Sequence, residues 1–194
     1  MKSKLLGLLA CVLAMPAAAT TITYSAALSG ANEVPPNASP GTGTATVTVD
    51  TVLNKMLVAV TFSGLTGTTT AAHIHCCTLV AGTGTAGVAT TTPYFPDFPI
   101  GVTAGTYSRL FDMTLASSFN PAFLTANGGT TASAWAALFA GFDAGKTYFN
   151  IHTNVFPGGE IRGFLQRTSV PEPGTLALVG LGLAGLGFTR RRKT

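Results

Sequence analysis

Charged residues are scarce in this chain of 194 residues, where Asp, Glu, Lys and Arg together make up 9%. The net charge of +4 comes from the two ends, which carry Lys2, Lys4 and the basic run 190–193. Between positions 20 and 170, five basic residues stand against six acidic ones, and five minus six leaves −1. A nucleic-acid surface needs clustered Lys and Arg, so the sequence argues against a nucleic-acid partner. Abundant Thr, Gly and Ala favour strands and turns over charged helical faces.

The chain also lacks the short motifs of the common enzyme classes. No G-x-S-x-G sequence occurs, and scattered serines do not make a catalytic triad. Residues 82–87 match G-x-G-x-x-G by letter, but no helical pattern follows them and no acidic residue lies at the expected distance in a βαβ unit. We therefore interpret 82–87 as a flexible loop and expect a binding or structural protein rather than an enzyme.

Residues 1–19 have the three parts of a secretory signal. Lys2 and Lys4 precede an apolar run over 5–15, and an alanine triplet ends at Ala19, where we expect signal peptidase to cleave. The apolar run is too short to remain as an anchor across a hydrocarbon layer of about 30 Å. A lipoprotein site at Cys11 is the alternative interpretation of this end.

Residues 169–194 combine a proline-rich break, an apolar segment over 176–188 and a basic cluster. The hydrophobicity predicts a short transmembrane helix with the basic cluster in the cytoplasm and the rest of the chain outside. The box Pro171-Glu172-Pro173, followed by these parts in this order, resembles the PEP-CTERM sorting signal of Gram-negative bacteria. The resemblance implies processing near the box by an exosortase-type protease, and a final location in the periplasm, on the cell surface or in an exopolysaccharide matrix.

The remaining residues, 20–168, read as one β-rich domain. Thr and Val alternate in 44–50 and 56–62, which predicts a hairpin, and 106–115 also has strand character. Asn120 and Pro121 are typical of a helix start, and 131–140 suits a second short helix. We predict an all-β fold, an antiparallel β-sandwich or flattened barrel with short helical insertions. Residues 81–99 are expected to form a long surface loop, which offers an adhesive surface as one alternative function.

Several segments of this domain resemble the CHRD domain, first named in chordin. They are 28–36, 43–49, 62–65, 73–75 and 148–165. The resemblance runs from about Tyr24 to Leu165 and implies a β-rich extracellular domain without an assigned activity. With the sorting signal, it predicts a binding or structural component of the cell envelope or exopolysaccharide matrix.

The three histidines of the chain lie in two segments that both read as strands. His73 and His75 are two residues apart, so their imidazoles project from one face of a strand. His152 lies in the predicted hairpin 146–166, on the face opposite its apolar neighbours. If the two strands pair, three imidazole nitrogens meet, which suits Zn or Cu with an open fourth position. The alternative is a polar face whose histidines are hydrogen-bonded to the backbone or to Tyr148 and Asn150.

Residues 62–75 are also similar to the His-x-His segment of copper/zinc superoxide dismutases. That resemblance implies a dinuclear site with more than three histidines, which this chain does not have. A mononuclear site remains, and three acidic residues are candidates to complete it: Asp97, Asp112 and Asp143. Glu160 and Arg162 either orient a ligand or His152, or form a surface ion pair.

Cys76 and Cys77 follow the histidine pair directly. In an oxidising compartment outside the cytoplasm two neighbouring thiols form a disulfide, and we expect a vicinal one here. The alternative is that Cys77 acts as a soft copper ligand beside His73 and His75.

Overall fold

The computed structural model describes residues 21–168, which form eight strands, two α-helices and two short 3-10 helices. In chain order these are β1 (Thr21–Ser29), η1 (Gly30–Asn32), β2 (Thr42–Asp50), β3 (Lys55–Ser63), β4 (Thr69–His75), β5 (Gly105–Asp112), η2 (Ala116–Ser118), α1 (Pro121–Ala126), α2 (Thr131–Asp143), β6 (Tyr148–Thr153), β7 (Ile161–Phe164) and β8 (Gln166–Arg167).

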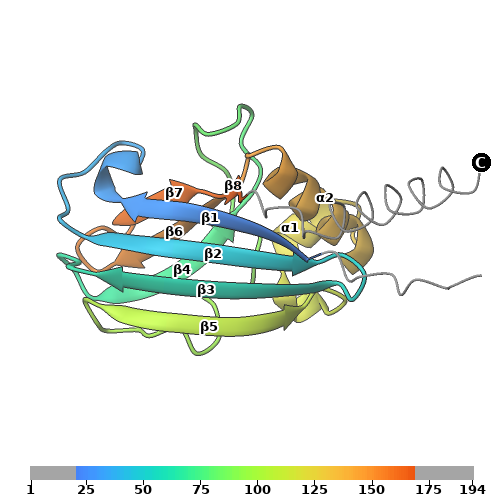
Figure 1. Cartoon of the computed structure of the whole chain (residues 1–194), viewed down its shortest axis with the longest axis horizontal. Coiled ribbons are helices and arrows are strands. Elements are labelled where there is room, and N and C mark those ends of the chain that lie inside the picture. Colours follow the sequence, from blue (N-terminus) through green and yellow to red (C-terminus); the bar gives the residue numbers. More distant parts are fainter. Residues whose placement is uncertain (1–20, 169–194) are drawn as a thin grey trace, which may run out of the picture.

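The strands build one antiparallel sheet in the order β4-β6-β7-β1-β2-β3-β5, with β8 also paired to β1. The sheet curls into a half-barrel, so that β4 and β6 lie behind β2 and β3 in Figure 1. The predicted all-β antiparallel class with short helical insertions is confirmed. Two separate sheets of a sandwich do not form within residues 21–168, because β1 pairs with β2 on one side and with β7 on the other and so joins both arms.

The hairpin of β2 and β3 shows how alternating residues in the sequence favour strands. Nine residue pairs run from Thr42 and Ser63 to Asp50 and Lys55. Ala45, Val47 and Val49 of β2 are fully buried, and the threonines that alternate with them are exposed or partly exposed. The carboxylate of Asp50 accepts two backbone N–H groups of the turn, which fixes its shape. The predicted hairpin is confirmed.

The two α-helices cover one end of the half-barrel (Figure 1). The side chain of Asn120 accepts the N–H of Ala122 at the start of α1, and Thr130 caps α2 in the same way. Phe142 of α2 stacks on Tyr24 of β1 with ring centres 5.1 Å apart. The predicted helix starts are confirmed, and the contact closes the apolar interior at this end.

The long connection between β4 and β5, residues 76–104, differs from its prediction. Residues 81–99 were expected on the surface, but Phe95 is fully buried and stacks on Phe149 of β6, 5.9 Å away. The backbone of this segment hydrogen-bonds to the free edge of β4, for example from Phe95 N to Ala72 O at 3.3 Å. An unpaired strand edge leaves backbone groups without partners, so residues 76–104, which we call the covering loop, are held against β4.

Within residues 21–168, no helix is long and apolar enough to cross a membrane. The predicted signal segment 1–19 lies outside the described residues, as do the sorting box and the predicted membrane helix over 176–188. The signal peptide and the membrane helix stay predictions.

Candidate metal centre

Pairing of β4 with β6 brings the three histidines together. Residues directly opposite each other include His75 with Tyr148 and Ala71 with His152. The apolar residues of both strands point into the core, and the histidines project from the other face. The ring centres of His73 and His152 are 5.3 Å apart, and one potential ligand atom from each histidine lies within 4.8 Å of the others. The predicted meeting of the imidazoles is what the geometry of the two strands produces.

Each imidazole is oriented by a backbone carbonyl. His73 Nε2 lies 2.6 Å from the carbonyl oxygen of Pro93. His75 Nδ1 lies 2.9 Å from that of Ala86, and His152 Nδ1 lies 2.9 Å from that of Pro157. A carbonyl oxygen only accepts, so each of these nitrogens donates its N–H. The second nitrogen of each neutral ring therefore carries a free lone pair.

Those second nitrogens are buried and have no hydrogen-bond partner among residues 21–168. They are Nδ1 of His73, Nε2 of His75 and Nε2 of His152. A buried polar atom without a partner costs about 1–3 kcal/mol, and here three such atoms occur in one cluster. Metal-binding histidines have this arrangement, with one nitrogen on the metal and the other donating to a carbonyl that fixes the ring.

Burial keeps the three rings neutral. Burial is the main cause that lowers the pKa of His73 to about 4; the hydrogen bond to Pro93 acts in the opposite direction, and the His152 ring adds a smaller lowering effect. Burial likewise lowers the pKa of His75 to about 4, and it lowers the pKa of His152. His73 and His75 are buried, and the His152 side chain is partly exposed, although its free nitrogen is buried. Neutral imidazole is the form that binds metal.

The donor set fits a mononuclear transition-metal ion. Two nitrogens on one tetrahedral Zn ion with bonds of about 2.0–2.1 Å lie about 3.3 Å apart. One nitrogen from each histidine lies within 4.8 Å of the others, so binding requires the imidazoles to draw closer together. Three imidazoles are a ligand set of Zn and Cu and leave one tetrahedral position for water or another ligand.

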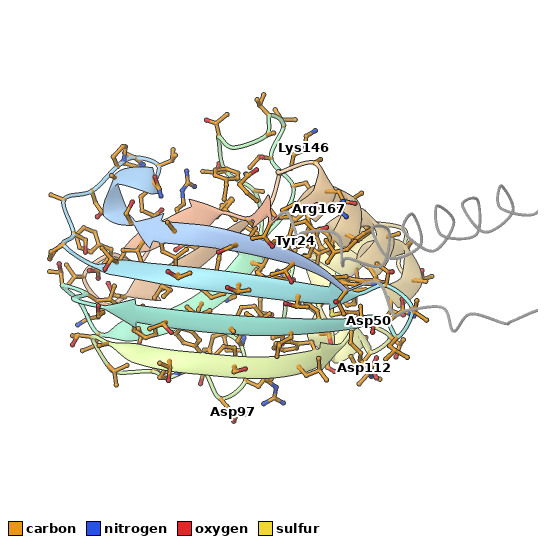
Figure 2. The ribbon with its side chains drawn as sticks, in the orientation of Figure 1. Tyr24, Asp50, Asp97, Asp112, Lys146 and Arg167 are labelled. Carbon is orange, nitrogen blue, oxygen red and sulfur yellow. A yellow bond between two sulfur atoms is a disulfide. The ribbon has the colours of Figure 1, made fainter. Side chains whose placement is uncertain are left out.

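The acidic candidates lie elsewhere, and their expected role is wrong. Asp97 pairs with Arg109, and Asp112 pairs with Lys55 at 2.6 Å. Asp143 accepts the hydroxyl hydrogen of Tyr24 at 2.6 Å. Figure 2 shows Asp97 and Asp112 at the rim of the molecule, consistent with these pairings. Within the described residues the cluster consists of the histidines alone.

Cys77 is not brought to the three histidines. The chain leaves the strand after His75, and the sulfur atoms of Cys76 and Cys77 are placed as a vicinal disulfide. Cys77 is exposed, and its Sγ lies 3.9 Å from the carbonyl oxygen of Ala137 in α2. A sulfur held in a disulfide is not a thiolate ligand. The disulfide itself stays a prediction, tested below.

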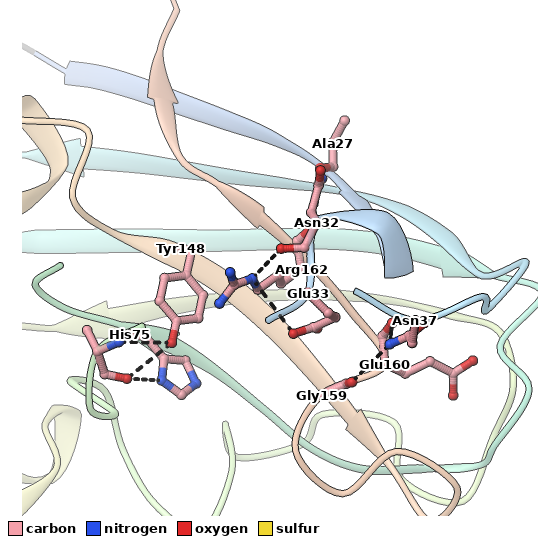
Figure 3. Close-up of polar contacts among 10 residues, drawn as sticks. Ala27, Asn32, Glu33, Asn37, His75, Tyr148, Gly159, Glu160 and Arg162 are labelled. Carbon is pink, nitrogen blue, oxygen red and sulfur yellow. Dashed lines mark hydrogen bonds and ion pairs between the residues drawn. The ribbon is translucent and has the colours of Figure 1, made fainter. Parts of the chain in front are cut away.

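Tyr148 separates the histidines from a buried arginine. Its ring stacks on His75 with centres 4.6 Å apart, and the Arg162 Cζ atom lies 4.7 Å from its centre on the β7 side. Figure 3 shows the three side chains in this order. The Nε of Arg162 is 3.7 Å from a carboxylate oxygen of Glu33. Burial raises the pKa of Glu33 to about 7, although Arg162 acts in the opposite direction.

Glu160 does not pair with Arg162, so the expected surface ion pair is wrong. Glu160 is fully buried, and its carboxylate accepts from Ser39 Oγ, Thr153 Oγ1 and the N–H groups of residues 66 and 67. Burial raises the pKa of Glu160, but these hydrogen bonds outweigh it and the net shift is downward. Glu160 thus ties the β3–β4 loop to the β6–β7 hairpin that carries His152.

Sequence reasoning missed the carbonyls of Ala86, Pro93 and Pro157. Every residue has a backbone carbonyl, so no residue type marks these positions. It also missed that Glu33 is the partner of Arg162, because η1 and β7 are far apart in the chain.

Comparison with protein families places this geometry in context. The model of the CHRD domain matches residues 24–165. The chain belongs to the CHRD-domain family. In this CHRD domain the three histidines lie inside the matched range, on β4 and β6. No curated protein matches the chain, and no solved structure matches it.

A PEP-CTERM protein-sorting motif matches residues 169–193, directly after the CHRD domain. Both resemblances noted from the sequence are thereby confirmed. The motif indicates export in Gram-negative bacteria, processing by an exosortase and transient membrane association at the C-terminus.

Proposed function

We propose that this exported CHRD-domain protein holds one Zn or Cu ion through His73, His75 and His152, and that it acts as a binding component of the cell envelope or exopolysaccharide matrix. The supporting observations are that each of the three imidazoles donates one N–H to a backbone carbonyl while its other nitrogen is buried and lacks a partner among residues 21–168, and that the three side chains form one cluster.

The alternative is a polar face whose histidines are satisfied by hydrogen bonds alone, and it accounts for only one of the two nitrogens of each imidazole. It accounts for the carbonyl contacts, but it leaves three buried nitrogens unpaired, which is unfavourable in a folded protein. One shared ion offsets all three costs at once. The low pKa values of His73 and His75 further favour a cation other than the proton.

The proposal assigns no reaction to the site. Three imidazoles bind a mononuclear ion, and an exosortase-processed chain is delivered outside the cytoplasm. The proposal includes the organisation expected from the sequence, with a signal peptide over 1–19, the CHRD domain over 20–168 and the sorting segment over 169–194. An open metal position then lets the ion bind a ligand of the envelope or matrix.

Metal content tests the proposal. Purified full-length protein is washed with chelator, loaded with Zn²⁺ or Cu²⁺, passed through a desalting column and measured by elemental analysis. We expect about one ion per chain for the wild type, and a loss of retained metal in His75→Ala and His152→Ala. Tyr107→Phe is the matched control, because it removes the hydrogen bond to Pro96 in the covering loop and touches no imidazole. Metal retained equally by wild type and both histidine variants contradicts the proposal.

A further inference from the structure

A pocket lies next to Arg162, on the other side of Tyr148 from the histidines. It has a volume of about 450 Å³ and opens to solvent. Its lining includes Asn32 of η1, Thr83 of the covering loop, Arg162 and Phe164 of β7, and Gln166 of β8. We call it the Arg162 pocket. The exposed amides, the hydroxyl and the aromatic ring give it a mixed polar and apolar surface.

Arg162 lines this pocket although its side chain is only 3% exposed. A guanidinium has five N–H donors. The Nε–H donates to the carbonyl oxygen of Asn32 at 2.5 Å, and the same nitrogen is the one nearest to Glu33, at 3.7 Å. Among residues 21–168, neither terminal nitrogen of Arg162 has a hydrogen-bond acceptor. The terminal nitrogens are not among the buried polar atoms without a partner, so their four N–H donors are accessible in the open pocket to water or to a ligand.

The aromatic rings do not satisfy these donors. The Arg162 Cζ atom is 4.7 Å from the ring centre of Tyr148 and 5.9 Å from that of Phe164. A ring attracts the cation through its π-electrons, but the terminal N–H groups lie in the guanidinium plane and still need acceptors. Figure 3 shows Nε turned toward Asn32 and Glu33, with the two terminal nitrogens on the other side of the guanidinium.

The chemistry that fits two terminal nitrogens of one arginine is a carboxylate. Its two oxygens accept two parallel N–H bonds in a fork, an arrangement worth more than a single ionic contact. Beside the guanidinium, the amide of Gln166, the hydroxyl of Thr83 and the amide oxygen of Asn32 have no hydrogen-bond partner within the described residues. Such groups bind hydroxyls, and Phe164 offers a ring for the apolar face of a sugar.

We infer that the Arg162 pocket binds the carboxylate of an acidic sugar, such as a uronic acid unit of a polysaccharide. This site is separate from the metal centre, because the Tyr148 ring lies between His75 and Arg162. It adds a recognition function that does not depend on the ion, and it names a chemical class of matrix ligand that the chain binds directly.

Calorimetric titration in the presence of a chelator tests this inference, because the chelator removes any metal-bridged binding at the histidines. The probes are a tri-galacturonate and its fully methyl-esterified form, with acetate and inorganic phosphate in separate arms. Full-length protein is expected to bind the acid at least about tenfold more tightly than the ester, since esterification removes the fork. Equal binding of acid and ester overturns the inference, and so does binding of phosphate or acetate as tight as that of the acid.

Variants identify the residue. Arg162→Lys keeps the charge but not the fork, and it is expected to weaken binding of the acid about tenfold. Arg162 is buried beside Glu33, so its substitution can also affect folding. Gln166→Ala at the exposed rim is therefore a second variant that leaves the core untouched, and it is expected to weaken binding of the acid about threefold. Lys146 does not line the pocket, so Lys146→Gln removes one positive charge without changing the lining and is expected to leave binding unchanged. If neither Arg162→Lys nor Gln166→Ala weakens binding, or if Lys146→Gln weakens it as much, the pocket is not the site.

Discussion

The buried histidines predict how the stability of the metal-free protein changes with pH. In the unfolded chain an imidazole takes up its proton near pH 6.5, whereas in the folded protein burial lowers the pKa of His73 and His75 to about 4. Between these values the unfolded state binds more protons. The contribution of His73 and His75 to the free energy of unfolding is therefore complete above pH 6.5 and is lost as the pH falls toward 4.

The size of the effect follows from the shift. Between about pH 7 and about pH 4.5, the loss is about 2.5 kcal/mol for each of these two histidines. Glu33 acts in the opposite direction, because burial raises its pKa to about 7 and its folded form takes up a proton first. Its contribution grows as the pH falls and offsets about as much as one histidine loses. The pH dependence of the wild-type free energy of unfolding therefore does not isolate the effect of the imidazoles. The difference in this free energy between wild type and a histidine variant does.

The variant for this test is His75→Gln, which keeps a polar side chain and removes the titration. Urea unfolding in chelator is measured for wild type and variant at about pH 7 and about pH 4.5. The stability gap between them is expected to change by about 2.5 kcal/mol in favour of the variant at the lower pH. Tyr148→Phe, which removes the hydroxyl bonded to Ala86 beside the same ring, is expected to show the same gap at both pH values. If the gap of His75→Gln also stays constant, the ring is not held neutral by burial and the reasoning is refuted.

Three further predictions concern the framework of the site. Glu160→Gln replaces the charged acceptor of four hydrogen bonds and is expected to lower the free energy of unfolding by about 2–4 kcal/mol in urea titrations; a loss below about 0.5 kcal/mol contradicts the assigned role. Gly163→Ala places a Cβ 2.2 Å from a carbonyl oxygen of β1 and is expected to unfold the protein or lower its melting temperature strongly, whereas Gly158→Ala meets no atom within 4 Å and serves as its control. Alkylation without reductant, followed by mass spectrometry, is expected to leave Cys76 and Cys77 unmodified; their labelling in native protein argues against the disulfide.

Local patterns were enough to predict much of the fold. The alternation of Thr and Val in 44–62 encodes the β2–β3 hairpin, and the pair Asn120 and Pro121 marks the start of α1. The spacing of His73 and His75 fixes their common face in a strand. Each of these inferences depends on neighbours in the chain, and strand geometry or cap chemistry turns them directly into structure.

The remaining features depend on contacts between distant segments. The path of 81–99 could not be predicted, because Phe95 is buried only by meeting β5 and β6 and by the free edge of β4. The curl of the single sheet depends on the pairing of Ser29 with Arg162, more than a hundred residues later. The acidic residues proposed as ligands were assigned by type alone, and their positions in the fold exclude that role.

The covering loop and the histidines form one unit. The carbonyls that set the rings of His75 and His73 come from Ala86 and Pro93 of this loop, and Phe95, two residues further on, anchors it in the core. The third carbonyl comes from the β6–β7 turn, whose strand ends are tied by Glu160 to the β3–β4 loop. The three rings therefore keep these orientations only when the loop is packed and the hairpin is closed. Because neither condition involves a ligand side chain, the geometry of this centre is set by the packing of the whole domain and not by the three histidines alone.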